Sequence, residues 1–182
     1  MLPAAKEMSS ELAQESLATR RVLERVPDDR FDWQPHAKSM TMGQLAIHVA
    51  RLPGRFALVL AMDGLEIVPP VPPPAPPPAI ATSAALLEEF DRGVAAAQAF
   101  LAGLTEETAS GPWRMTHTGR EVFTLPRLAA FRRLLLNHTY HHRGQLTVYL
   151  RLLDVLVPAV YGRSADEDGF AAAAERGGMR IG

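Results

Sequence analysis

The chain has 182 residues, of which 47% are hydrophobic, and its formal net charge at pH 7 is −1. This length and composition are typical of one folded domain, here residues 1–182, and the balanced charge argues against binding nucleic acid. The chain contains no cysteine, which excludes disulfides and a cysteine nucleophile and leaves histidine and carboxylate groups as candidate metal ligands. It has no apolar leader and no run of about 18 apolar residues, so we expect a cytoplasmic protein without membrane contacts.

Four segments of the chain carry apolar residues at intervals of three or four, which is the spacing of one helix face. Such segments predict an all-α fold in which four helices pack their apolar faces together as an up-and-down bundle. We expect these helices at about residues 4–26, from Thr41 to at least Val59, at 83–103 and at 125–153.

The second and third predicted helices carry local signals. Thr41 and Gln44 have the residue types and spacing of a capping box, and Thr82 or Ser83 can cap the third helix. Proline removes a helical hydrogen bond, so we expect Pro53-Gly54 to kink or interrupt the second helix.

Two segments between the helices are predicted to be extended. Eight of the ten residues 69–78 are proline, which favours polyproline II. This segment could be a ligand for an aromatic groove, but its place between two helices favours a stiff crossover along the bundle. Residues 113–123 alternate around Thr118-Gly119, which predicts a short hairpin or extended excursion before the fourth helix. A short terminal helix at about residues 165–174 is also compatible with the sequence.

Histidines occupy apolar faces of two predicted helices. His138 and His142 are four residues apart and fill the gap between Leu135 and Leu146, so both point from one face. His48 has an equivalent place in the second helix. A buried imidazole needs a polar partner, because leaving it unpaired costs roughly 1–3 kcal/mol. Each ring could make its own hydrogen bond, or all three could bind one divalent metal ion and leave a position for water or substrate.

Three motifs surround these histidines: KSMTMGQL at residues 38–45 before His48, LNHTYHHRGQL at 136–146, and YGRSADE at 161–167. With them, the chain from about residue 31 to 167 resembles the DinB-like (DinB/YfiT) superfamily of bacterial helical bundles. The resemblance implies a four-helix bundle, a homodimer, and one divalent metal ion, zinc or nickel, on the three histidines. Its better-understood relatives are metal-dependent thiol S-transferases and isomerases that use low-molecular-weight thiols.

Several functions remain open for such a site. The metal could deprotonate a thiol, as the resemblance implies, or activate water for hydrolysis. The alternative is a non-catalytic metal-binding or stress-related interaction bundle. No catalytic residue is identified, but Gln44, Tyr140, His141 and Gln145 are candidates for contacts to the ligands or substrate, with packing or solvation as the simpler explanation. Because ligand rings must be unprotonated, we expect metal binding to weaken below about pH 6.5.

The fourth predicted helix is rich in arginine and has no acidic residue between Arg127 and Arg151. These arginines could receive an anionic substrate, or they could form a solvated face or part of a dimer contact. They are Arg127, Arg132, Arg133, Arg143 and Arg151.

Overall fold

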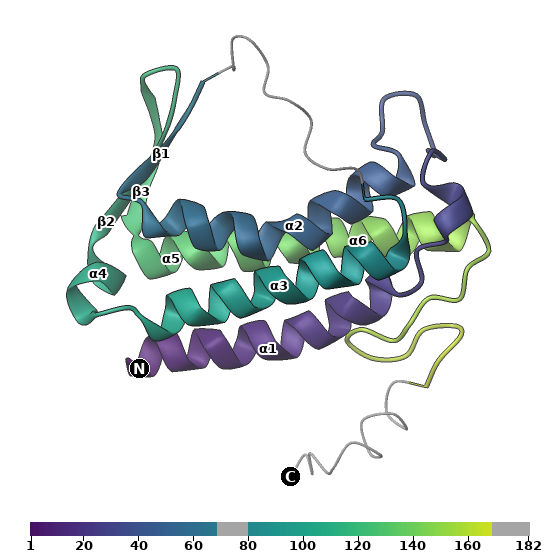
Figure 1. Cartoon of the computed structure of the whole chain (residues 1–182), viewed down its shortest axis with the longest axis horizontal. Coiled ribbons are helices and arrows are strands. Elements are labelled where there is room, and N and C mark those ends of the chain that lie inside the picture. The colour runs from purple at the N-terminus through teal and green to yellow at the C-terminus, as the bar shows by residue number, and fades with distance from the viewer. Residues whose placement is uncertain (69–79, 169–182) are drawn as a thin grey trace.

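The computed structural model describes residues 1–68 and 80–168, and four helical segments lie side by side along its length (Figure 1). The proline-rich segment expected as a crossover lies outside the described residues, as does most of the expected terminal helix, whose residues 165–168 are not helical. Within the described residues, no helix combines the length and apolar character that a membrane crossing needs. The four segments are α1 (Pro3–Leu23), α2 (Met42–Ala61), α3 (Ser83–Ala102), and a last one that joins α5 (Arg127–Phe131), a π-helical turn (Arg132–Leu136) and α6 (Asn137–Leu152).

The helices do not alternate in direction along the chain. Arg51 of α2 lies 3.9 Å from Glu89 of α3, and one turn later Gly54 meets Gly93, so α2 and α3 run parallel. Figure 1 shows that α3 begins at the end of the fold opposite to the end where α2 stops, and that α1 and α6 run the other way. The expected up-and-down order is therefore wrong, and the helices run up, down, down, up.

The capping signals are confirmed. The Thr41 hydroxyl accepts a hydrogen bond from the backbone N–H of Gln44, and the Gln44 side chain accepts one from the Thr41 N–H. Thr82, rather than Ser83, caps α3 by accepting from the N–H of Ala85. These short side chains satisfy N–H groups that have no partner inside the helix.

α2 is not interrupted at Pro53, where the sequence predicts a kink or break. The helix is continuous from Met42 to Ala61. The neighbouring Gly54 serves a contact between helices, since a Cβ built on Gly93 of α3 would lie 2.7 Å from the Gly54 nitrogen. Two facing glycines therefore let the backbones of α2 and α3 come close, which fixes where the helices cross.

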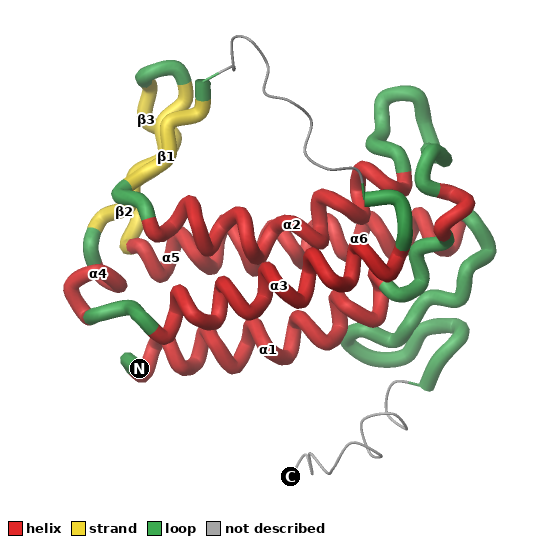
Figure 2. The backbone as a smooth tube through the Cα atoms, in the orientation of Figure 1, coloured by secondary structure: helices red, strands yellow, loops and turns green. Residues whose placement is uncertain are grey.

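A three-stranded sheet at one end of the helices makes the fold mostly helical rather than all-α (Figure 2). β2 (Pro112–His117) and β3 (Arg120–Pro126) form the predicted hairpin. Its turn residues Thr118 and Gly119 both have positive φ, as a type I′ turn requires. β1 (Gly64–Ile67), which pairs in parallel with β2, and α4 (Glu106–Ser110) are absent from the sequence prediction because each is only four or five residues long.

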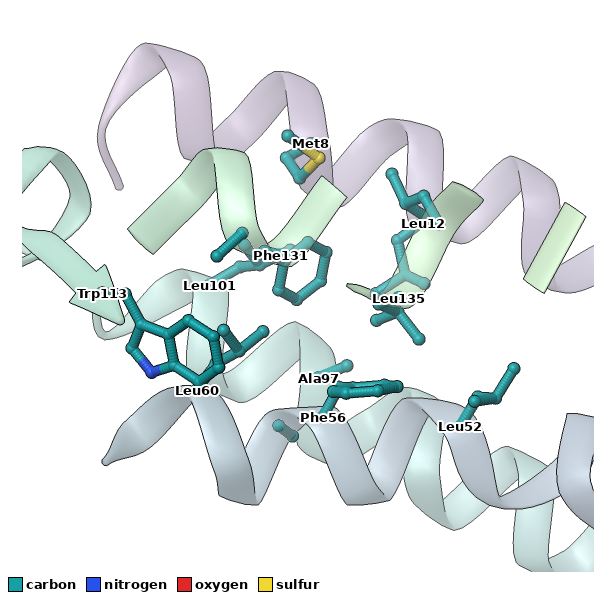
Figure 3. Close-up of a cluster of buried hydrophobic side chains, with 13 residues drawn as sticks. Met8, Leu12, Leu52, Phe56, Leu60, Ala97, Leu101, Trp113, Phe131 and Leu135 are labelled. Carbon is teal, nitrogen blue, oxygen red and sulfur yellow. The ribbon is translucent and has the colours of Figure 1, made fainter. Parts of the chain in front are cut away.

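The helices share a core of two hydrophobic clusters. One cluster surrounds Trp113 beside the sheet (Figure 3), and the other surrounds Phe90 towards the far end of the helices. On the last helical segment, Leu136 belongs to the first cluster and Leu146 to the second. The residues between them therefore lie at the junction of the two clusters, where polar side chains displace little of the hydrophobic core.

Candidate metal centre

Three histidines come together between α2 and α6. His48 projects from α2, His138 and His142 project from successive turns of α6, and one ring nitrogen of each lies within 4.8 Å of the others. The Nε2 atoms of His48 and His138 are 3.2 Å apart. The three ring pairs have centroid distances between 4.5 and 5.0 Å. The spacing found in the sequence therefore corresponds to one compact cluster of imidazoles.

The rings are half-buried, whereas the sequence places them on the fully buried face. The buried face of α6 runs through Thr139, Arg143, Leu146 and Leu150 instead. A π-helical turn contains one more residue than an α-helical turn, so the turn Arg132–Leu136 moves the buried face on by one position. The histidines consequently flank the core and remain accessible from solvent.

Arg143 occupies the buried position next to His142, although the sequence suggests a solvated or contact face for it. It is 2% exposed, and its guanidinium donates to the Glu15 carboxylate at 2.8 Å and the Thr19 hydroxyl at 3.2 Å, both on α1. The guanidinium also lies over the Tyr161 ring, 4.9 Å from its centroid. These contacts fix the rotation of α6 about its axis and thereby the direction of its histidines.

The other arginines of this segment also have partners within the chain. The contacts are Arg127 with the carbonyls of Leu60 and Thr108, Arg132 with Glu11, Arg133 with the ring of Phe123, and Arg151 with Asp166.

Burial lowers the pKa of two of these imidazoles, those of His48 and His138. The pKa of His48 falls from 6.5 to about 4 because burial disfavours the cation, and the charges of His142, His138 and Arg55 act in the same direction. The pKa of His138 is also lowered, first by burial and then by His142. At these two rings, protons therefore compete with a metal ion at a lower pH than the value of about 6.5 expected from the sequence.

In two of the histidine rings, a hydrogen bond occupies one nitrogen atom and leaves the other nitrogen available to a ligand. Nδ1 of His142 lies 2.7 Å from Oε1 of Gln145, and His138 makes a hydrogen bond to the backbone of Leu134. An imidazole that donates from one nitrogen carries its lone pair on the other. Two of the three rings are thus oriented to present a lone pair to the centre of the cluster.

The donor set fits one divalent ion. Tetrahedral zinc with Zn–N bonds of about 2.0–2.1 Å places its nitrogen ligands about 3.3 Å apart. The Nε2 atoms of His48 and His138 already have a separation of 3.2 Å, and all three nitrogens lie within 4.8 Å. Among the described residues, no carboxylate joins this cluster.

Two of the four further candidates lie beside His142 on α6. Gln145 makes the hydrogen bond to its Nδ1. The ring of His141 lies 4.8 Å from that of His142 but is exposed. Its side chain leaves the helix in a direction about 100° away from that of His142. The spacing i, i+3 identifies Gln145 as the one candidate that reaches a proposed ligand.

The other two candidates are engaged elsewhere. Gln44 lines the same groove as His48, but its side chain also closes the capping box of α2. The hydroxyl of Tyr140 donates to Oε1 of Glu11 at 2.8 Å, on the side of α6 that faces α1. Neither contact reaches the nitrogen atoms of the cluster.

A groove of about 880 Å³ follows α2 beside α3 and includes His48 in its lining. Sequence reasoning missed it because its two walls come from helices whose parallel packing was not predicted. Its lining combines arginines with aliphatic side chains, and His48 is the histidine of the cluster that it exposes to solvent. The lining includes Ile47, Arg51, Leu52, Arg55, Leu58, Val59, Glu89 and Arg92.

A sequence profile of the DinB family matches residues 1–173. The chain belongs to the DinB family. The fold is similar to that of a DinB-like protein (YjoA) from Bacillus subtilis, with a TM-score of 0.63 and 20% identity over 86% of this chain and 99% of that one. A DinB-like protein from Bacillus cereus gives a TM-score of 0.61 and 20% identity over 84% of this chain and 94% of that one. No curated protein matches the chain.

Proposed function

We propose that this DinB protein binds one divalent metal ion, zinc or nickel, on His48, His138 and His142 and acts as a metal-dependent thiol S-transferase. The observation that carries the proposal is the convergence of three half-buried imidazoles, one of which, His48, also lines an open groove. Three neutral nitrogens leave a coordination position for an exchangeable ligand, as in catalytic rather than structural zinc sites. The chain has no cysteine, so the thiol is a low-molecular-weight substrate.

The residues around the cluster support thiol activation. A bound ion would supply a Lewis acid that lowers the pKa of a thiol and provides a thiolate nucleophile near neutral pH. Gln145 holds the His142 ring, and Phe56 packs 6.0 Å from His138 and limits access of water on that side. Hydrolysis would need a proton acceptor, and no carboxylate of the described residues joins the cluster.

Metal analysis of two neighbouring variants tests the ligand set. His142→Ala should lose most of the bound metal because it removes one nitrogen ligand, while circular dichroism should show intact helices. His141→Ala is the matched control, since its ring points about 100° away around α6 and should leave the metal content unchanged. Metal loss in His141→Ala with metal retained in His142→Ala would show that the proposed ligand set is wrong.

A thiol-transfer assay tests the activity. The metal-loaded protein is given cysteine and an aryl chloride, so that a carbon–sulfur bond replaces the carbon–chlorine bond and chloride and a proton leave. We expect the wild type to accelerate the transfer and His142→Ala to lose the acceleration. Full metal occupancy without turnover of any small thiol would support the alternative of a non-catalytic metal-binding bundle.

We also propose that the protein acts in the cytoplasm, where thiols stay reduced.

We further propose that the protein is a homodimer. Val148 and Leu152 are each 57% exposed on one face of α6. On the same face, a Cβ added to Gly144 would meet nothing within 4 Å. A second copy packed there would bury these apolar side chains. Sedimentation that finds only monomer at micromolar concentration would contradict the dimer.

A further inference from the structure

The groove beside the histidines carries an excess of positive charge, although the whole chain has a formal charge of −1. Arg51, Arg55 and Arg92 line it, with Glu89 as the acidic residue among the lining side chains. Glu89 lies 3.9 Å from Arg51 and also pairs with Arg92. A concave surface with a local excess of cations attracts anions.

Arg55 is the arginine of this lining that remains available to a ligand. It is exposed, and no ion pair or hydrogen bond links it to another residue in the described part of the chain. Arg55 follows His48 by seven residues, so it points within about 20° of the same direction and lies about 10 Å further along α2. After burial and the neighbouring histidines, its charge also lowers the pKa of His48 and His138.

The surface around Arg55 and His48 is aliphatic. Leu52, Leu58 and Val59 line the groove, and the side chain of Leu58 is 75% exposed. Gly54 also lines it where α2 and α3 meet backbone to backbone, so no side chain fills that part of the floor. A hydrocarbon chain placed along the groove would therefore cover apolar surface that the protein leaves in water.

We propose that this groove binds a small aliphatic carboxylate. Arg55 binds its carboxylate, while its hydrocarbon part lies over Leu58 and Val59, which follow Arg55 along α2 and lie further from His48. A guanidinium can donate two parallel hydrogen bonds to a carboxylate, which gives both affinity and orientation. Binding of a carboxylate in the groove requires neither metal nor thiol, so this inference is independent of the proposed thiol transfer.

Calorimetric titration of octanoate into the metal-free full chain at low salt tests the inference. We expect Arg55→Ala to bind octanoate about tenfold more weakly than the wild type, because it loses a charge-assisted hydrogen bond. Arg120→Ala removes another exposed arginine, on β3, and should bind like the wild type. The neutral alcohol 1-octanol should not distinguish Arg55→Ala from the wild type.

Other results of the titration overturn the inference. No octanoate binding to the wild type, or equal octanoate affinity in the wild type and Arg55→Ala, would exclude Arg55 as the anion-binding residue. Weakening of octanoate binding by Arg120→Ala to the same degree would show a non-specific charge effect.

The groove and the metal centre can fail separately. Octanoate binding that depends on Arg55, together with no uptake of added zinc or nickel by the histidines, would support the groove and contradict thiol transfer. Metal-dependent thiol transfer, together with an octanoate affinity that is the same in the wild type and Arg55→Ala, would overturn the groove inference and leave the proposed function in place.

Discussion

At the scale of single residues, Gln145 determines which nitrogen of His142 is available to a ligand. Its Oε1 atom lies 2.7 Å from Nδ1 of His142, one turn earlier on α6. An imidazole that donates from Nδ1 keeps its lone pair on Nε2, and the hydrogen bond also restricts rotation of the ring. Gln145 is exposed, so its effect on a ligand can be measured with little change in folding.

We expect Gln145→Ala to weaken zinc binding by about tenfold, since removing a partner that orients a ligand ring typically has this effect. Competition of the purified protein with a zinc chelator measures the dissociation constant. Gln14→Ala makes the same chemical change at an exposed position of α1 and should keep the wild-type affinity. Identical zinc affinity in Gln145→Ala and the wild type would show that the His142 ring is oriented by other contacts.

Residue spacing identified the histidine cluster, but it could not give the exposure of the rings. His138 and His142 share a face because i, i+4 neighbours always do on a helix. The π-helical turn Arg132–Leu136 left no recognisable signal in the sequence, and it moved the buried face to Thr139 and Arg143. The role of Arg143 depends on where α1 lies, and the residue spacing within α6 carries no information about that position.

At the scale of secondary structure, the capping box of α2, the cap of α3 and the hairpin turn were predictable because their hydrogen bonds join residues three or fewer positions apart. Helix direction was not predictable in this way. Apolar periodicity shows that a helix has a buried face, but it does not show whether its neighbour runs parallel or antiparallel. β1 was not predictable either, because its four residues pair with a strand that lies far along the chain.

The parallel contact between α2 and α3 depends on the glycine pair. A Cβ on Gly93 would lie 2.7 Å from the nitrogen and 3.3 Å from the Cα of Gly54, and backbone atoms cannot move aside as a side chain can. We expect Gly93→Ala to lower the free energy of unfolding by about 1–3 kcal/mol, as overpacking typically does. Urea denaturation followed by circular dichroism measures the change.

Gly144→Ala is the matched control for this prediction. A Cβ at Gly144 meets nothing within 4 Å, and alanine favours the helix over glycine by about 1 kcal/mol, so this variant should be more stable than the wild type. Wild-type stability in Gly93→Ala would contradict the close helix contact. Destabilisation by Gly144→Ala would indicate that another molecule packs tightly against Gly144 itself.

At the scale of the whole molecule, the segment after α6 joins the last helix to the first. The Glu167 carboxylate accepts a hydrogen bond from the N–H of Ala159 at 3.0 Å and pairs with Arg21 and Arg25 of the first helix and the loop after it. Asp166 pairs with Arg151 of α6. The motif at residues 161–167 is therefore part of the structure that holds α1 and α6 together, away from the histidine cluster.

This connection should depend on pH. The hydrogen bond from Ala159 and, after it, the contact with Arg21 lower the pKa of Glu167. Its pKa in the unfolded chain is about 4.3, so the unfolded state binds the proton more readily as the pH falls. The stabilisation by the ionised carboxylate is therefore complete above about pH 4.3 and is lost as the pH falls through the lower value of the folded state.

Glu167→Gln cannot ionise, so we expect it to unfold at a lower temperature than the wild type near neutral pH and to approach the wild type as the pH falls towards 3. Thermal unfolding followed by circular dichroism at a series of pH values measures this difference, and the other carboxylates affect both proteins alike. Glu7→Gln, at an exposed position of α1, should follow the wild type throughout. A difference between Glu167→Gln and the wild type that stayed constant with pH would show that the contact does not depend on the charge of Glu167.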